Sequence, residues 1–226
     1  MHTGKWWWVT QKTGRTIIPV IISSDKTQLT VFRNKTAYPV YLTIGNIPKH
    51  IRRKPSRRAH VLLAYLPTAK LDHITNKAAR RRTQANLFHA CMGHILKPLE
   101  EYGITGLPMT SGDGAVRSGH PIFSNYVGDY PEQVLVTAVK TGECPECPVP
   151  PNELGNPESV RSPRELGKIL EALDSVSQGP TAFAQACREA GCGMRTLQRP
   201  HRRLLQRHLF LSFYIFSTHS SHTLFN

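Results

Sequence analysis

An uninterrupted apolar run near the start of the chain places the strongest constraint on the fold. Residues 17–22 read Ile-Ile-Pro-Val-Ile-Ile, two serines follow, and the run closes at Asp25. The β-branched residues favour a strand. An apolar run that ends in an acidic residue is how α/β folds place a carboxylate at the carboxyl edge of a sheet. The sequence therefore predicts a strand over 17–24 with Asp25 at its end.

A second aspartate has a similar setting. Asp113 lies in Met-Thr-Ser-Gly-Asp-Gly at 109–114, after a predicted strand over 107–112. Two such carboxylates can share divalent cations, and two-metal sites drive in-line displacement at phosphorus. Each aspartate is equally explained as a turn residue, since Asp-Lys and Gly-Asp-Gly both mark turns. Carboxylates more than about 8 Å apart could not share two metals held about 3.5–4 Å apart.

The order of the predicted elements indicates a fold class. Three predicted strands lie at 17–24, 28–32 and 38–45, and a predicted helix follows at 71–102. Next come a strand at 107–112, which ends at an aspartate, and one further strand at 133–139. This order matches a ribonuclease H-like α/β fold, in which the first and fourth strands are neighbours. In that fold Asp25 and Asp113 would come together.

The charge of the chain favours a polyanionic partner. The formal net charge is +14, from 29 Lys and Arg against 15 Asp and Glu. Between residues 49 and 82 there is one acidic residue, Asp72, among many basic ones. Nucleic acid is the commonest partner of such a chain, so this run predicts a surface that contacts phosphates. It could also be an ordinary solvated face, or a nuclear import signal. The basic residues that we expect to bind DNA are Lys49, Arg52, Arg53, Lys54, Arg57, Arg58, Arg80, Arg81 and Arg82.

Two cysteines have the spacing of half a zinc knuckle. Cys144 and Cys147 flank Pro-Glu, and structural zinc takes four such ligands. The other ligands stay open among Cys187, Cys192 and the histidines, and a redox dithiol or a turn without metal explains the pair too. Asp129 and Glu132 are further carboxylates for an acidic site, although a turn before the strand over 133–139 would also account for them.

Composition suggests how the chain is divided. No secretory signal is visible at the start, and the longest apolar stretch near the end, 209–216, is too short to span a bilayer. We therefore expect an intracellular protein with reduced cysteines. We expect an N-terminal remnant at 1–15 and a ribonuclease H-like core at 16–142. A Cys-x-x-Cys knuckle with a linker should follow at 143–160, then a helical segment at 161–190 and a disordered tail at 191–226.

Several segments together resemble a known family. They are Ser-Ser-Asp-Lys-Thr-Gln-Leu-Thr at 23–30, the run from Ala37 to Pro48, Gly-Asp-Gly-Ala-Val-Arg at 112–117, Asp-Tyr-Pro-Glu-Gln at 129–133, and Cys-Pro-Glu-Cys at 144–147. In this order they resemble the Plavaka transposases of fungal DNA transposons. The resemblance implies Mg²⁺-dependent DNA cleavage and joining in the nucleus, with an acidic triad whose first two ligands are Asp25 and Asp113.

The resemblance also has limits, which leave the activity open. Recognisable family sequence is expected to stop near Ala190, ahead of the helical region that carries the third acidic residue in relatives. We therefore expect a transposase fragment that is catalytically incomplete. The alternatives are a non-catalytic relic that binds DNA without sequence preference, or an unstable translation product. Homo-oligomers are compatible with each functional alternative.

Overall fold

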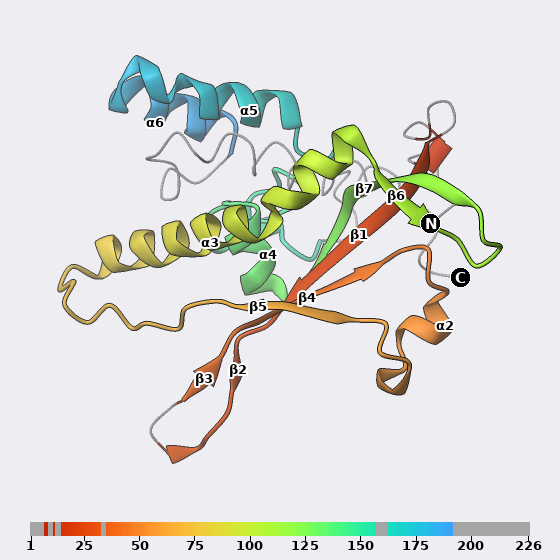
Figure 1. The fold of residues 1–226 in the computed structure, drawn as a ribbon. Helices are drawn as coiled ribbons and strands as arrows, with labels where there is room; N and C mark the ends of the chain where they lie inside the picture. Colours follow the sequence, from red (N-terminus) through yellow and green to blue (C-terminus); the bar gives the residue numbers. More distant parts are fainter. Residues whose placement is uncertain (1–6, 9–10, 12–14, 33–34, 157–161, 192–226) are drawn as a thin grey trace.

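The fold is built around one mixed sheet. The computed structural model describes residues 7–8, 11, 15–32, 35–156 and 162–191. Strands of the main sheet lie in the spatial order β5-β4-β1-β7-β6 (Figure 1). Their bounds are β1 (Thr16–Ser24), β4 (Pro39–Ile44), β5 (Val61–Tyr65), β6 (Leu107–Thr110) and β7 (Val116–Val127). The predicted strand over 17–24 is confirmed as β1, at the centre of this order.

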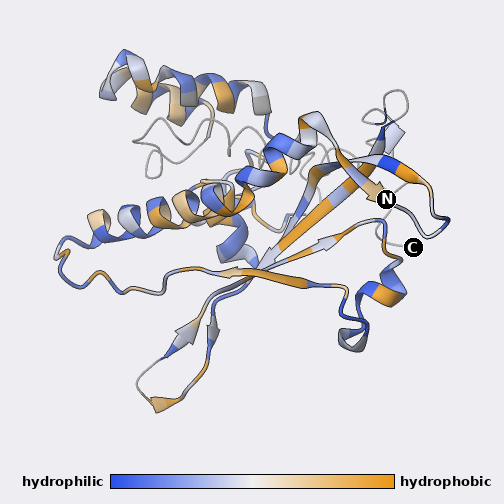
Figure 2. Ribbon diagram, in the orientation of Figure 1, coloured by the Kyte–Doolittle hydropathy of each residue, from blue (hydrophilic) through white to orange (hydrophobic). Residues whose placement is uncertain are grey.

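Strand β1 is apolar from Ile17 to Ile22 because both of its faces are covered. It runs antiparallel to β4, with Ile22 opposite Leu42, and parallel to β7, with Ile22 beside Tyr126. Neighbouring residues of a strand point to opposite faces, and both Ile21 and Ile22 are buried. Figure 2 shows the resulting hydrophobic band along β1. A strand buried on both faces has a continuous apolar run in place of an alternating one.

The long helix α3 (Lys77–Thr105) packs against one face of the sheet. It begins after Asn76, whose side chain accepts hydrogen bonds from the backbone N–H groups of Ala78 and Ala79, as a helix N-cap does. Phe88 and Met92 of this helix belong to the main hydrophobic core together with residues of β1. The helix predicted over 71–102 is confirmed, with both ends shifted towards the C-terminus.

The segment predicted as a strand over 133–139 is helical instead. Helix α4 (Tyr130–Val136) begins after Asp129, whose carboxylate accepts a hydrogen bond from the N–H of Glu132. Pro131 lies in the first turn, where its missing N–H costs nothing. These start signals outweigh the strand preference of the valines, and both Val134 and Val136 are still buried in the helical conformation.

The strands predicted over 38–45 and 107–112 are confirmed as β4 and β6, whereas the strand predicted over 28–32 needs correction. The segment 28–32 does not enter the main sheet: β2 (Thr27–Gln28) pairs with β3 (Thr36–Ala37) in a separate hairpin. Strands β5 and β7 were not predicted, since β5 follows a long basic stretch and β7 mixes Gly, Pro and polar residues with apolar ones. The observed mixed α/β sheet is compatible with a ribonuclease H-like arrangement, with β7 as the parallel neighbour of β1.

Shorter helices complete the described part. They are α2 (Lys49–Arg52), α5 (Leu166–Asp174) and α6 (Pro180–Glu189), with 3-10 turns at Pro55–Arg57, Pro151–Glu153 and Ser175–Gln178. A second hydrophobic core joins Ile169 of α5 with Phe183 and Cys187 of α6 and with Ala138. Among the helices described, none is long and apolar enough to cross a membrane.

Candidate functional site

Two exposed aspartates lie where β1 and β7 end side by side. The strands are parallel, and Ser23 and Val127 are their last paired residues. Asp25 follows Ser23 by two residues and Asp129 follows Val127 by two. Neighbouring strands lie about 4.8 Å apart, so both aspartates belong to the same edge of the sheet. Both side chains are exposed there, open to a cation or a substrate.

Asp113 lies at the opposite end of the sheet. It is in the turn that connects β6 to β7, and β7 reaches β1 where Gly119 pairs with Thr16. The nine residues of β1 span roughly 30 Å, and Asp25 follows their far end. The prediction that Asp25 and Asp113 share a pair of metals is therefore wrong. The reason is topological, because the strand beside β1 is β7, which begins after this turn.

The surroundings of Asp113 are those of a turn residue. Arg117 donates two hydrogen bonds to its carboxylate, at 2.9 and 2.7 Å, and the N–H of Ala115 donates a third at 3.1 Å. The guanidinium of Arg117, followed by this backbone N–H, lowers the pKa of Asp113 to about 2. The alternative that Asp113 is a turn residue accounts for all of these contacts.

A buried carboxylate lies immediately behind the aspartate edge. Glu132, in the first turn of α4, is 8% exposed and accepts hydrogen bonds from three hydroxyl groups. Tyr38 donates at 2.7 and 2.6 Å to its two oxygens, Tyr126 donates at 3.3 Å, and Ser24 donates to Oε1. Burial raises the pKa of Glu132, while the hydroxyl groups of Ser24, Tyr38 and Tyr126 lower it.

This Glu132 cluster joins the elements that carry the two aspartates. Ser24 is the last residue of β1, next to Asp25, and Tyr126 lies in β7. The N–H of Glu132 itself donates to Asp129 at 3.0 Å. Gly128 adds a steric requirement, because a Cβ there would come within 2.8 Å of the Glu132 side chain. We infer that Glu132 is a positioning residue, which the sequence indicated only as a further carboxylate.

We expect the substitution Glu132→Gln to flatten the pH dependence of stability above pH 4.5. Burial raises the pKa of Glu132 above its usual 4.5, so the folded protein binds this proton more tightly than the unfolded chain does. Its contribution to the free energy of unfolding is complete below pH 4.5 and is lost as pH rises through the raised pKa. Urea unfolding from about pH 4 to 8 measures this slope.

The control for this experiment is Asp113→Asn. The pKa of Asp113 is lowered, so its effect on stability has the opposite pH dependence. Its contribution to the free energy of unfolding is present above the usual pKa of 3.8 and is lost as pH falls towards 2. This variant should therefore leave the slope above pH 4.5 unchanged. Equal slopes in the wild type and in Glu132→Gln would contradict the assignment.

The basic residues expected to bind DNA form two separate groups. The first, which we call the α2 group, consists of Lys49, Arg52, Arg53, Lys54, Arg57 and Arg58. The second, the α3 group, consists of Arg80, Arg81 and Arg82. Asn46, just before α2, donates to the carbonyl of Ile17, so the first group lies towards the Thr16 end of β1. β5 ends where Tyr65 pairs with Pro39, towards the Asp25 edge, before the chain enters α3.

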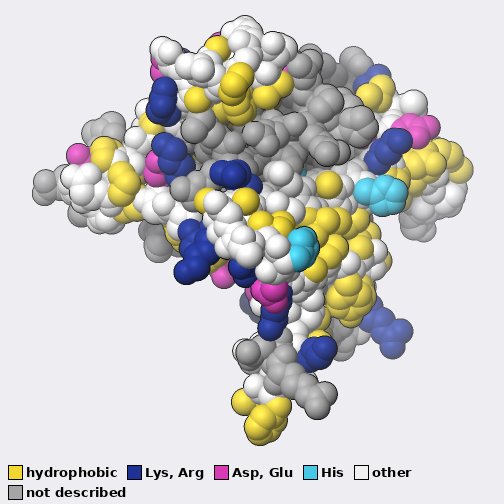
Figure 3. Space-filling view, turned by 90° about the vertical axis from the view of Figure 1, so that its left-hand side faces the viewer, with side chains coloured by type: hydrophobic (Ala, Val, Ile, Leu, Met, Phe, Trp, Pro, Cys, Tyr) yellow, Lys and Arg dark blue, Asp and Glu magenta, His cyan; other side chains and the backbone are white. Residues whose placement is uncertain are grey.

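These positions separate the expected DNA surface into two parts. Figure 1 shows α2 and the start of α3 on opposite sides of the molecule. Figure 3, seen from the side where α3 begins, shows Lys and Arg side chains spread between hydrophobic ones. The basic run is therefore not one continuous surface, because β5 carries the chain across the sheet between its two halves. The α3 group is the one on the side of Asp25 and Asp129.

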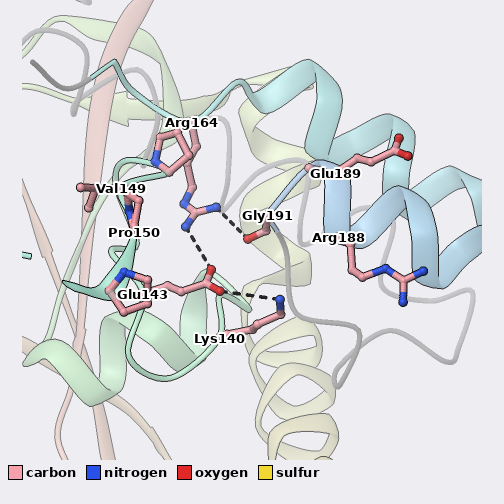
Figure 4. A pocket seen from close by; sticks show the side chains of 11 residues that line it. Lys140, Glu143, Val149, Pro150, Arg164, Arg188, Glu189 and Gly191 are labelled. Atoms are coloured by element: carbon pink, nitrogen blue, oxygen red, sulfur yellow. Dashed lines mark hydrogen bonds and ion pairs between the residues drawn. The ribbon is translucent and has the colours of Figure 1, made fainter. Parts of the chain in front are cut away.

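The cysteine pair lies in a loop that a buried arginine holds in place. Arg164 is 4% exposed and donates to the carbonyls of Cys144 at 3.0 Å and Gly191 at 2.7 Å. It also forms an ion pair with Glu143 at 3.4 Å, beside a pocket of about 260 Å³ (Figure 4). Arg164 lies in the segment 161–190 that the sequence predicted to be helical, and α5 begins two residues after it, at Leu166.

A zinc knuckle is not seen around this pair. Cys144 is half-buried and Cys147 is buried. Within the part of the chain that the structure describes, no group of three or more His, Cys, Asp or Glu is placed to hold a metal ion. The described residues therefore do not fit a four-ligand zinc site. Cys192, one of the expected additional ligands, lies outside the described residues.

Comparison with known proteins agrees with the resemblance in sequence. No curated protein matches the chain. The family model described as Plavaka transposase matches residues 1–210. This match extends past Ala190, where we expected recognisable family sequence to stop. Because it covers most of the 226 residues, the chain belongs to the Plavaka transposase family.

Proposed function

We propose that this chain cuts and joins DNA strands, with Asp25 and Asp129 holding Mg²⁺ at the carboxyl edge of β1 and β7. The observation that carries the proposal is the parallel register, in which each residue of the Ser23–Val127 pair is followed two positions later by an aspartate. Membership of a transposase family supports DNA as the substrate. Asp129 thereby takes the role that the sequence suggested for Asp113.

The two aspartates suit magnesium in their chemistry. Mg²⁺ is usually bound through one or two carboxylates, with water and substrate phosphate as its other ligands. When bound, the metal would neutralise charge on the phosphate and activate the attacking water or 3′-hydroxyl. Asp25 and Asp129 are exposed, and the Glu132 cluster holds the strand ends from which they project. The α3 group would contact the DNA backbone beside them.

A nicking assay on supercoiled DNA with Mg²⁺ tests this proposal. We expect Asp25→Asn and Asp129→Asn each to lower the rate by at least about 100-fold, as loss of a metal ligand does. Asp113→Asn is the matched control, an exposed aspartate at the far end of the sheet, and it should retain the wild-type rate. Loss of nicking in Asp113→Asn with full activity in Asp129→Asn would reject the assignment.

DNA binding without cleavage is the second candidate function. The net charge of +14 and the two basic groups favour it, and it requires no third carboxylate. Affinity should then fall steeply as salt rises, because binding to phosphates releases counterions. If the wild type binds DNA in this manner but does not nick it with Mg²⁺ or Mn²⁺, the chain is the catalytically incomplete protein that we expected from its sequence. The exposed Arg81 and Arg82 also suit a nuclear import signal.

A further inference from the structure

A small hairpin projects from the sheet directly after Asp25. It consists of residues 26–32 and 35–37, in which Thr27 pairs with Ala37 and Gln28 with Thr36. Figure 1 shows β2 and β3 extending away from the main sheet. Among the described residues beyond the paired ones, the N–H of Leu29 donates to the carbonyl of Lys35 at 2.8 Å and Thr30 Oγ1 donates to the carbonyl of Phe32 at 2.6 Å.

The end of this hairpin exposes large apolar side chains. Leu29, Val31 and Phe32 are 63%, 84% and 85% exposed. Figure 3 shows hydrophobic side chains at the end of the projection at the bottom of the view. Single exposed apolar residues are ordinary, but three at the end of one projecting element indicate a contact surface.

The charge around these apolar residues is positive. Lys26 and Lys35 of the hairpin are exposed, and the sequence contains no Asp or Glu between Asp25 and Asp72. Apolar side chains flanked by cations suit nucleic acid, because the cations contact phosphates while apolar side chains insert between bases or stack on them. An apolar protein partner would use the side chains of the tip but would leave the lysines without a role.

We propose that the hairpin is a DNA-contacting arm, in which Lys26 and Lys35 bind phosphates and Phe32 inserts against an unstacked base. This inference rests on the proposed function, since it takes DNA as the substrate at Asp25. Fully extended, the seven residues from Asp25 to Phe32 would span at most about 23 Å, or about seven base steps of 3.4 Å. The arm would thus contact DNA within about seven nucleotides of the bond that is cut.

The test uses the full chain and DNA duplexes with and without a short single-stranded gap, in EDTA so that no cleavage occurs. Fluorescence anisotropy should show Lys26→Ala/Lys35→Ala binding at least about 10-fold more weakly, with the salt slope reduced by about two. The double variant Lys140→Ala/Lys168→Ala removes the same charge from residues outside the hairpin and should change the affinity much less. Equal losses in the two double variants would overturn the arm.

Phe32 is tested through the base it would contact. Phe32→Ala should abolish the preference for gapped over intact duplex, and should remove the fluorescence change of 2-aminopurine placed in the gap. Val116 is another exposed apolar residue, at 68%, and Val116→Ala should leave both the duplex preference and the fluorescence change as in the wild type. A Phe32→Ala variant that keeps wild-type DNA binding but changes from dimer to monomer in sedimentation would show that a second copy covers the tip, and would overturn the proposal.

The outcomes separate this inference from the proposed function. If the arm variants bind DNA more weakly in EDTA while the wild type fails to nick DNA, the arm stands and the cleavage proposal fails. If nicking depends on Asp25 and Asp129 but the arm variants bind as the wild type does, the proposal of a DNA-contacting arm is wrong and the proposed cleavage site is supported.

Discussion

Glu132→Ala should lower the free energy of unfolding by about 3–5 kcal/mol, a shift in melting temperature of roughly 10 °C. The side chain is 8% exposed and accepts from the hydroxyls of Ser24, Tyr38 and Tyr126. Truncation would leave Tyr38 without its acceptor, and Ser24 and Tyr126 with only the hydrogen bond that they share. Each buried donor left unpaired costs about 1–3 kcal/mol, and loss of the packed side chain adds to this. Chemical unfolding followed by circular dichroism measures the loss.

Two further variants give the prediction its controls. Glu171→Ala removes an exposed glutamate from α5 and should change stability by no more than about 0.5 kcal/mol. Tyr38→Phe removes one hydroxyl, and its effect should be less than additive with Glu132→Ala, because the two groups share a hydrogen bond. Strict additivity would show that the Glu132 cluster does not act as one unit.

Ile22→Ala should destabilise the protein by about 2–5 kcal/mol, because it opens a cavity in the middle of the sheet. Ile22 is 0% exposed and lies between Leu42 of β4 and Tyr126 of β7. Val116→Ala removes the same class of side chain from a position that is 68% exposed and should cost no more than about 0.5 kcal/mol. Similar losses in the two variants would mean that β1 is not the centre of the core.

Sequence patterns were sufficient where a segment is governed by its own residues. The apolar run of β1 predicts a buried strand, since a strand covered on both faces has a nearly continuous run of apolar side chains. Apolar residues recur at helical spacing in α3, and Phe88, Cys91, Met92, Ile95 and Leu99 all pack into the main core. The segment that became α4 shows the limit, because its valines suit a strand and only the start signals at Asp129 and Pro131 predict the helix.

Which aspartate shares a sheet edge with Asp25 was decided by the tertiary structure. By itself the sequence determined the family, the central strand and the aspartate at its end, because these depend on residues that are contiguous in the chain. Which strand lies beside β1 depends on how distant segments pack, and β7 has no continuous apolar run to identify it. Parallel pairing then brings Asp129 to the Asp25 edge and sends Asp113 to the other end, because a hairpin reverses the chain between β6 and β7.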